Sequence, residues 1–169
     1  HLRLAEERNK VGENPNPQIM EAMSIAENML RENKIPEAAK MLPEIVESCA
    51  RTGVDYSEIL QITRAVVDAP TMPDGKRPQA LLRLAQTESA IGLDCAKTLS
   101  RALEATKDIR NDVSRYRALT DIGEVSMGLG KENDAFLQAK YLAEKLDNKY
   151  LQTIRSEEHT SELQSPCNL

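Results

Sequence analysis

Few side chains in this 169-residue sequence could carry out catalysis or bind a metal ion. Between His1 and His159 there is no histidine, the residue that general acid–base chemistry and metal sites use most often. The same stretch holds two cysteines, Cys49 and Cys95. Cys95 stands at an expected helix start, where the helix dipole lowers the pKa of a thiol and activates it. No base accompanies Cys95, so we interpret both cysteines as small apolar packing residues.

The segment Gly128-Leu129-Gly130-Lys131 has the composition of a phosphate-binding loop. Such a loop needs a further glycine five positions before Gly130, where Val125 stands, and Ser or Thr after Lys131. It also follows a strand, whereas this segment follows an expected helix. We therefore predict a helix end and a turn here. The chain is expected not to be an enzyme, and we predict no catalytic residue, no cofactor-binding residue and no metal ligand.

The densest group of charges is formed by Asp108, Arg110, Asp112, Arg115 and Arg117. One interpretation is an anion-binding patch. The other, which we favour, is a solvated turn between two helices, with charges that complement the helix dipoles.

The C-terminal segment 155–169 differs in character from the rest. From Arg155 it reads RSEEHTSELQS, which resembles the in-frame translation of the adapter used in short-read DNA sequencing. We therefore expect 155–169 to be a non-native tail and exclude it from fold analysis. Because the first residue is not Met, we also expect the N-terminus to be incomplete, so that the chain is an internal fragment of a longer repeat protein.

The charge of the chain is mildly acidic and dispersed. The tail contributes one basic and three acidic residues to totals of 22 and 27, which leaves a net charge of −3. This balance argues against a nucleic acid or an anionic membrane as the main partner. No run of eighteen apolar residues is present, so no membrane-spanning helix is expected. Two cysteines form no disulfide framework, and the cellular compartment stays undecided.

One spacing recurs three times and indicates how the chain is organised. A small residue is followed seven positions later by Gly or Asn, and four or five positions after that by Ala. This spacing is typical of a helical hairpin, with a close helix crossing, a left-handed turn residue and an alanine that packs back. The three instances are Ala26, Asn33, Ala38; Ala85, Gly92, Ala96; and Gly123, Gly130, Ala135.

Apolar residues recur at helical spacing along the chain, and nowhere do they alternate as in a strand, so the fold is expected to be all-α. Pro17, Pro36 and Pro78 stand where helices should begin, at positions whose missing N–H costs nothing. Pro43 lies inside an expected helix and should kink or shorten it.

The segments RPQALLRLA at Arg77 and RYRALTDIG at Arg115 indicate a repeat of 38 positions. We expect 1–17 to be the end of a preceding helix with a linker, and 18–154 to be an array of helical repeats. Its expected units are about 18–52, 77–110 and 114–147, with an irregular insert at about 55–76. Another helix is expected to begin at 150–154.

These residues resemble the tetratricopeptide family. The third unit carries the best signature, Ile122-Gly123, then Gly130 and Ala135, with Leu142-Ala143 in its second helix. The resemblance covers 18–147, with the insert as a gap. The chain departs from the family pattern where a large aromatic residue is expected in the first helix, because Met29, Glu88 and Ser126 stand there. The resemblance implies a right-handed αα-solenoid of tetratricopeptide-like hairpins, open at its ends.

Tetratricopeptide arrays bind extended peptides along a concave surface lined by first helices. By resemblance we expect a non-catalytic scaffold for protein–protein interaction that binds a peptide or protein segment in this way. The alternative is an accessory repeat module of a larger enzyme or sensor whose functional domain is missing. Partners are expected to be a protein or peptide, with no nucleic acid and no membrane, and the chain is expected to self-associate through its uncapped end. The positions that match the binding surface are Gln79, Gln86, Ser89, Arg117, Thr120 and Glu124.

Overall fold

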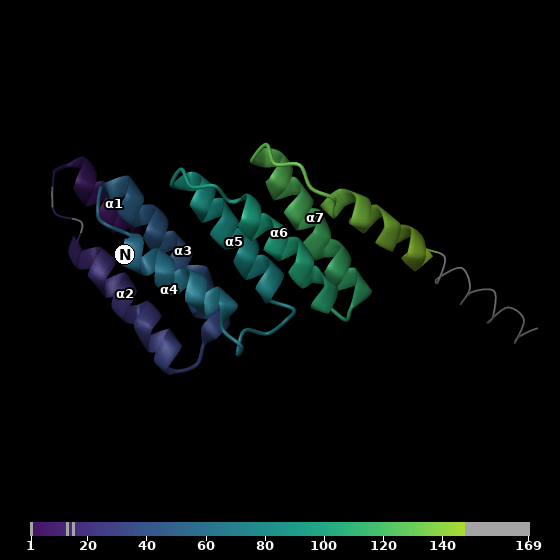
Figure 1. Ribbon diagram of the computed structural model, residues 1–169. Coiled ribbons are helices and arrows are strands. Elements are labelled where there is room, and N and C mark those ends of the chain that lie inside the picture. Colours follow the sequence, from purple (N-terminus) through teal and green to yellow (C-terminus); the bar gives the residue numbers. More distant parts are fainter. Residues whose placement is uncertain (1, 13, 15, 148–169) are drawn as a thin grey trace, which may run out of the picture.

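The computed structural model describes residues 2–12, 14 and 16–147, and this part of the chain is helical with no strand (Figure 1). The predicted all-α class is confirmed. The expected helix start at 150–154 and the tail 155–169 lie outside the described residues. The helices are α1 (Leu2–Lys10), α2 (Asn16–Arg31), α3 (Ile35–Thr52), α4 (Ser57–Asp68), α5 (Arg77–Ala90), α6 (Ala96–Ala105), the short 3₁₀ turn η1 (Thr106–Asp108), α7 (Asp112–Gly128) and a further helical stretch at 135–147.

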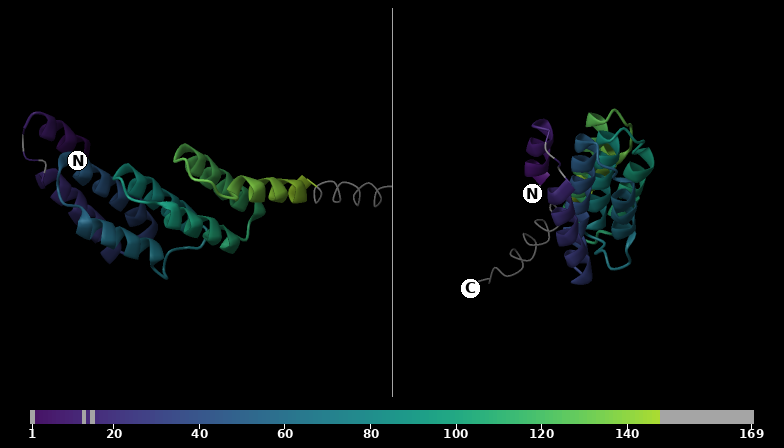
Figure 2. Two further views of the ribbon diagram at one scale, coloured as in Figure 1. Left: turned by 45° about the horizontal axis from the view of Figure 1, so that its top comes forward. Right: turned by 90° about the vertical axis from the view of Figure 1, so that its left-hand side faces the viewer.

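Each helix packs against its neighbours along the chain, as consecutive pairs. A second set of contacts joins alternate helices: α3 packs against α1 and α5, and α5 packs against α7. These four helices form one row, which we call the odd row, while α2, α4 and α6 pack against it. Figure 2 shows the array bending into a shallow arc. Any site on the odd row is therefore built from helices that are not consecutive in sequence.

The three predicted turn residues have the left-handed backbone that a tight helix end requires. The φ angles are 57° at Asn33, 80° at Gly92 and 64° at Gly130. At each turn the next residue donates its N–H to the carbonyl five positions earlier, which satisfies a carbonyl that the helix end would leave unpaired. The donors and acceptors are Lys34 and Met29 (2.8 Å), Leu93 and Glu88 (2.7 Å), and Lys131 and Ser126 (2.8 Å).

The small residues of the recurring pattern lie where helices come close together. Ala26 and Ala85 are fully buried. At Gly123, a Cβ atom would lie 2.8 Å from the nearest ring carbon of Phe136, so the ring occupies the space that any other residue would need. The close crossing predicted for the third hairpin is confirmed at this contact.

The sequence predicted that Pro43 would kink or shorten its helix, and the shortening does not occur. Helix α3 continues for 18 residues, from Ile35 to Thr52, and Pro43 itself is buried. Four helices, α1, α2, α4 and α5, pack against α3. Because tertiary packing provides most of the stability of a helix, this burial outweighs the single backbone hydrogen bond that proline removes.

The segment expected to be an irregular insert contains helix α4, which packs against α3 and α5. The loop that follows α4 is anchored by Met72, only 2% exposed, and by Arg77, whose Nη2 donates to the carbonyls of Ala69 (3.1 Å) and Met72 (3.3 Å). This loop returns the chain so that α5 lies beside α3. The expected unit boundaries stay predictions.

Candidate functional site

The six positions that the resemblance selected all lie on two helices of the odd row. On α5, Gln79 is exposed, and Gln86 and Ser89 are partly buried. On α7 the exposed positions are Arg117 and Glu124, while Thr120 is partly buried and donates its hydroxyl to the Tyr116 carbonyl at 3.0 Å.

The structure brings two of these six residues together. Gln79 and Arg117 line one hollow between α5 and α7, of about 320 Å³, next to Asp121. The other four residues do not line this hollow. We call it the α5–α7 hollow.

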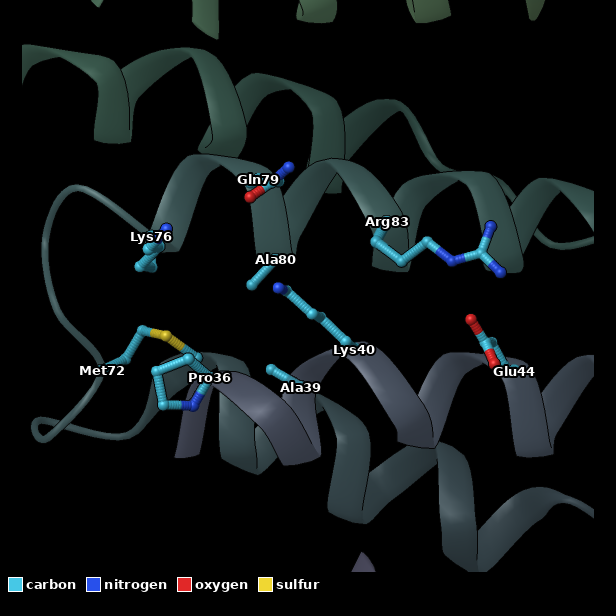
Figure 3. Close-up of a pocket in the computed structure, with 9 residues that line it drawn as sticks. All are labelled: Pro36, Ala39, Lys40, Glu44, Met72, Lys76, Gln79, Ala80 and Arg83. Atoms are coloured by element: carbon cyan, nitrogen blue, oxygen red, sulfur yellow. The ribbon is translucent and has the colours of Figure 1, made fainter. Parts of the chain in front are cut away.

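A second hollow, of about 240 Å³, lies between α3 and α5 (Figure 3). Ligand pockets for drug-sized molecules usually measure roughly 300–1,000 Å³. This α3–α5 hollow is smaller, and its size suits one inserted side chain. Its apolar residues are Pro36, Ala39, Met72 and Ala80, and its polar residues are Lys40, Glu44, Lys76, Gln79 and Arg83.

Positive charge dominates the polar edge of the α3–α5 hollow. Lys40 and Lys76 form no ion pair with any residue in the described part of the chain. Figure 3 shows Lys40 reaching from α3 across the hollow toward Ala80 on α5. Arg83 is already paired, because its Nη2 lies 3.3 Å from Oε1 of Glu47. Glu44, at the far end of the lining, also has no ion-pair partner in the described part of the chain. The charges available to a ligand are therefore two lysines and one carboxylate.

Helices α3 and α5 both begin beside this hollow, and neither has a side-chain cap. Each has a proline in its first two positions, and the residues before them, Lys34 and Lys76, make no capping hydrogen bond. Helix α7 differs, since the Asn111 side chain accepts a hydrogen bond from the Ser114 N–H at 2.8 Å. The positive ends of two helix dipoles thus lie beside the α3–α5 hollow without a side-chain cap. Part of this charge is already compensated, because Glu37 stands in the first turn of α3 and the Pro73 carbonyl accepts from the Arg77 N–H at 3.1 Å.

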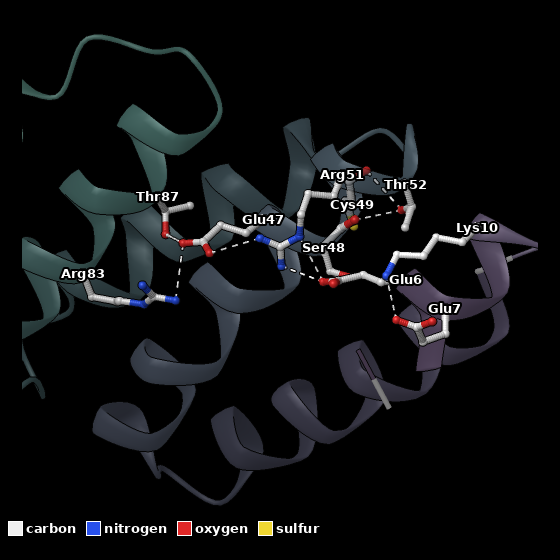
Figure 4. A network of polar contacts seen from close by, with 10 residues as sticks. All are labelled: Glu6, Glu7, Lys10, Glu47, Ser48, Cys49, Arg51, Thr52, Arg83 and Thr87. Carbon is white, nitrogen blue, oxygen red and sulfur yellow. Dashed lines mark hydrogen bonds and ion pairs between the residues drawn. The ribbon is translucent and has the colours of Figure 1, made fainter. Parts of the chain in front are cut away.

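The other end of the seam between α3 and α5 is closed by paired charges, which we call the Glu47 network (Figure 4). Glu47 Oε1 accepts from the Thr87 hydroxyl at 2.6 Å and lies 3.3 Å from Arg83 Nη2. Its Oε2 lies 3.7 Å from Arg51 Nη1. Arg51 in turn donates to Oε1 of Glu6 on α1 at 2.7 and 3.0 Å. The network joins α1, α3 and α5.

Glu88 is the most deeply buried carboxylate among the described residues, with only 3% of the residue exposed. Its Oε1 accepts from Arg64 Nη2 (2.7 Å) and Nε (3.1 Å), and its Oε2 accepts from the Thr98 hydroxyl (2.6 Å). These bonds join α4, α5 and α6. The equivalent residue of the next hairpin, Ser126, is also buried and accepts from the Asn133 amide. At both positions a satisfied polar group replaces the aromatic residue of the family pattern.

The residues that the sequence suggested for catalysis or phosphate binding are buried or paired in the structure. Cys49 is fully buried, and this burial raises the pKa of its thiol. Cys95 is 1% exposed and precedes α6. Lys131 pairs with Asp94 at 3.0 Å. Within residues 2–12, 14 and 16–147, no group of three or more His, Cys, Asp or Glu could hold a metal ion, and no helix is both long and apolar enough to cross a membrane.

The sequence did not reveal Lys40, Lys76 or the hollow between them. Lys40 lies in the first expected unit and Lys76 at the end of the expected insert, and only the contact of α3 with α5 brings them together. The small residues Ala39 and Ala80, which leave the space, were the available signal. Comparisons with protein-family models, curated proteins and solved structures give no match to this chain. The function of the hollow therefore has to follow from the chemistry of its own residues.

Proposed function

We propose that this chain is a non-catalytic interaction scaffold, a right-handed, tetratricopeptide-like stack of helical hairpins that receives a peptide or protein segment. The segment lies across α3, α5 and α7, on the odd row. The observation that carries this proposal is the α3–α5 hollow, an apolar depression whose edge holds Lys40 and Lys76 without an ion-pair partner in the described chain.

The two hollows of the odd row support an extended ligand. The α3–α5 and α5–α7 hollows share Lys76 and Gln79, so they adjoin each other across the start of α5. A segment that crosses α5 at this point contacts both. Stacked helix pairs commonly present extended surfaces of this kind to their partners.

Peptide selection tests the proposal on the intact chain. A phage-displayed library of random peptides is selected against the immobilised protein, and the enriched peptides are measured against two matched variants. Gln79→Trp places an indole between the hollows, while Gln61→Trp makes the same change at an exposed position of α4. We expect Gln79→Trp to weaken binding by about tenfold or more, which corresponds to about 1.4 kcal/mol, and Gln61→Trp to leave it unchanged.

Two results would contradict the proposal. One is that no peptide is enriched above an empty-surface control. The other is that the enriched peptides bind Gln79→Trp as tightly as the unchanged chain, which would place their site elsewhere.

A further inference from the structure

We infer that the segment received by the α3–α5 hollow is acidic and inserts one aliphatic side chain between α3 and α5. This inference rests on the proposed function and names the partner chemistry of the same surface. It follows from three features of the hollow: its unpaired lysines, its two uncapped helix ends and its apolar floor.

The lysines provide charge complementarity to an acidic segment. Lys40 and Lys76 come from opposite sides of the hollow and have no ion-pair partner among the described residues. The chain as a whole carries a net charge of −5, so this positive edge stands against an acidic background. Carboxylates of a bound segment would pair with both lysines, and such pairing mainly sets partner choice and association rate.

The helix ends add a second source of attraction for anions. Helices α3 and α5 begin at Ile35 and Arg77, at the same side of the seam, and neither receives a side-chain cap. Backbone N–H groups in the first turn of a helix carry partial positive charge and bind carboxylates. Pro36 and Pro78 have no N–H, and the Arg77 N–H already donates to the Pro73 carbonyl. At the remaining first-turn N–H groups a ligand carboxylate would take the role that Asn111 performs for α7.

The floor of the hollow indicates an aliphatic anchor between the acidic residues. Met72 is 2% exposed, Ala39 is 1% exposed and Ala80 is 9% exposed, so the floor offers hydrocarbon and little else. A free inorganic anion would leave this floor uncovered. A single-stranded nucleic acid is disfavoured because no aromatic side chain lines the hollow for base stacking.

Fluorescence anisotropy with three labelled peptides tests the inference. The first has a central leucine with four glutamates on each side, the second replaces every glutamate with glutamine, and the third replaces the leucine with glycine. We expect the first peptide to bind about tenfold more tightly than the second and several-fold more tightly than the third. Its affinity should fall as salt is raised, because exposed charges are screened.

Matched protein variants locate the attraction. The double variant Lys40→Glu, Lys76→Glu should weaken the acidic peptide by about tenfold or more. The control double variant Lys97→Glu, Lys140→Glu makes the same change in net charge at exposed positions that line neither hollow, and it should change affinity by less than about twofold. Circular dichroism verifies that both variants keep their helix content.

The outcomes separate this inference from the proposed function. If the glutamine peptide binds as tightly as the acidic peptide and both are lost in Gln79→Trp, acidity is wrong while the scaffold stands. If the hollow and control variants weaken the acidic peptide equally, the attraction does not lie at Lys40 and Lys76. Tighter binding of a uridine oligonucleotide than of the acidic peptide would also overturn the inference. If the library yields no peptide either, both proposals fail.

Discussion

At one end of the seam between α3 and α5, Glu47 is held by Thr87, Arg83 and Arg51; at the other end, Lys40 and Lys76 have no ion-pair partner within the described chain. The charged residues at the two ends of this seam therefore differ in whether they are paired within the protein. Charges that satisfy one another across the seam stabilise the array, whereas charges without an internal partner remain available for a ligand. We therefore interpret the Glu47 network as structural and keep the α3–α5 hollow as the proposed binding place.

Burial provides a scale on which to test this comparison. The exposed fraction of the carboxylate side chain is 3% at Glu88, 14% at Glu47 and 72% at Asp94. Removing a hydrogen-bonded group costs more stability when water cannot reach the partners that it leaves behind. The cost of removing each carboxylate should therefore fall in this order.

The largest effect is expected for Glu88→Ala. The change removes the acceptor of Thr98 and of Arg64 inside the array, and should lower the free energy of unfolding by about 2–4 kcal/mol. Arg64 is half-exposed and can rehydrate, which keeps the loss below the upper limit for a fully buried pair. Urea denaturation followed by circular dichroism measures it. The matched control Glu104→Ala, at an exposed position of α6, should stay within about 0.5 kcal/mol. Equal losses in the two variants would show that Glu88 does not hold the helices together.

Glu47→Ala should be the next most costly change, at about 1–2 kcal/mol. Thr87 loses its acceptor, and Arg83 and Arg51 lose a shared partner between α3 and α5. The control is Glu44→Ala, one turn earlier on the same helix, where the carboxylate is exposed at the hollow. Urea midpoints at neutral pH compare the two. If Glu44→Ala costs as much as Glu47→Ala, the two ends of the seam do not differ as described.

The helix ends could be predicted from sequence because their causes are local. Asn33, Gly92 and Gly130 adopt positive φ at little cost, and the bonds that close each end join residues five positions apart. Pro43 shows the limit of local rules, because burial by four neighbouring helices decided its helix.

The candidate site was less accessible to sequence reasoning. Gln79, selected by resemblance as a binding position, lines both hollows, and Arg117 joins it in the α5–α7 hollow. Their role in binding stays a prediction, and Lys40 and Lys76 were not among the selected positions. Their proximity depends on a loop that carries the chain past α4 and back beside α3. The burial of Glu88 could not be predicted from the sequence either. A buried carboxylate is tolerated only where groups from other helices satisfy it, and here those groups are Arg64 and Thr98.

Asp94 extends the comparison to an exposed carboxylate. Its pKa is lowered below 3.8, chiefly by the hydrogen bond from Lys131 and then by the Ala96 N–H. A lowered pKa contributes stability above the pKa of the unfolded chain, and this contribution is lost as pH falls through the folded-state value. Asp94→Asn keeps an oxygen that can accept from Ala96 and removes the charge. We expect a small difference in urea midpoint at neutral pH that narrows as the pH falls below the ordinary pKa of an aspartate. A difference that persists unchanged in acid would mean that the charge is not its source.

The smallest effect on stability is expected at the hollow itself, for the double variant Lys40→Ala, Lys76→Ala. Neither lysine has an ion-pair partner to lose within the described chain, and Lys76 immediately precedes α5, where positive charge is unfavourable. The free energy of unfolding should therefore stay the same or rise by up to about 0.5 kcal/mol. Arg51→Ala is the matched loss of a cation at the other end of the seam. It should lower stability because Glu6 loses the guanidinium that pairs with it and Glu47 loses one of its partners. If the lysine variant instead loses more than about 1 kcal/mol, the lysines support the fold, and their lack of partners no longer argues for a ligand. An unchanged or raised stability would mean that both lysines line the hollow without stabilising the fold, as expected of residues that serve binding.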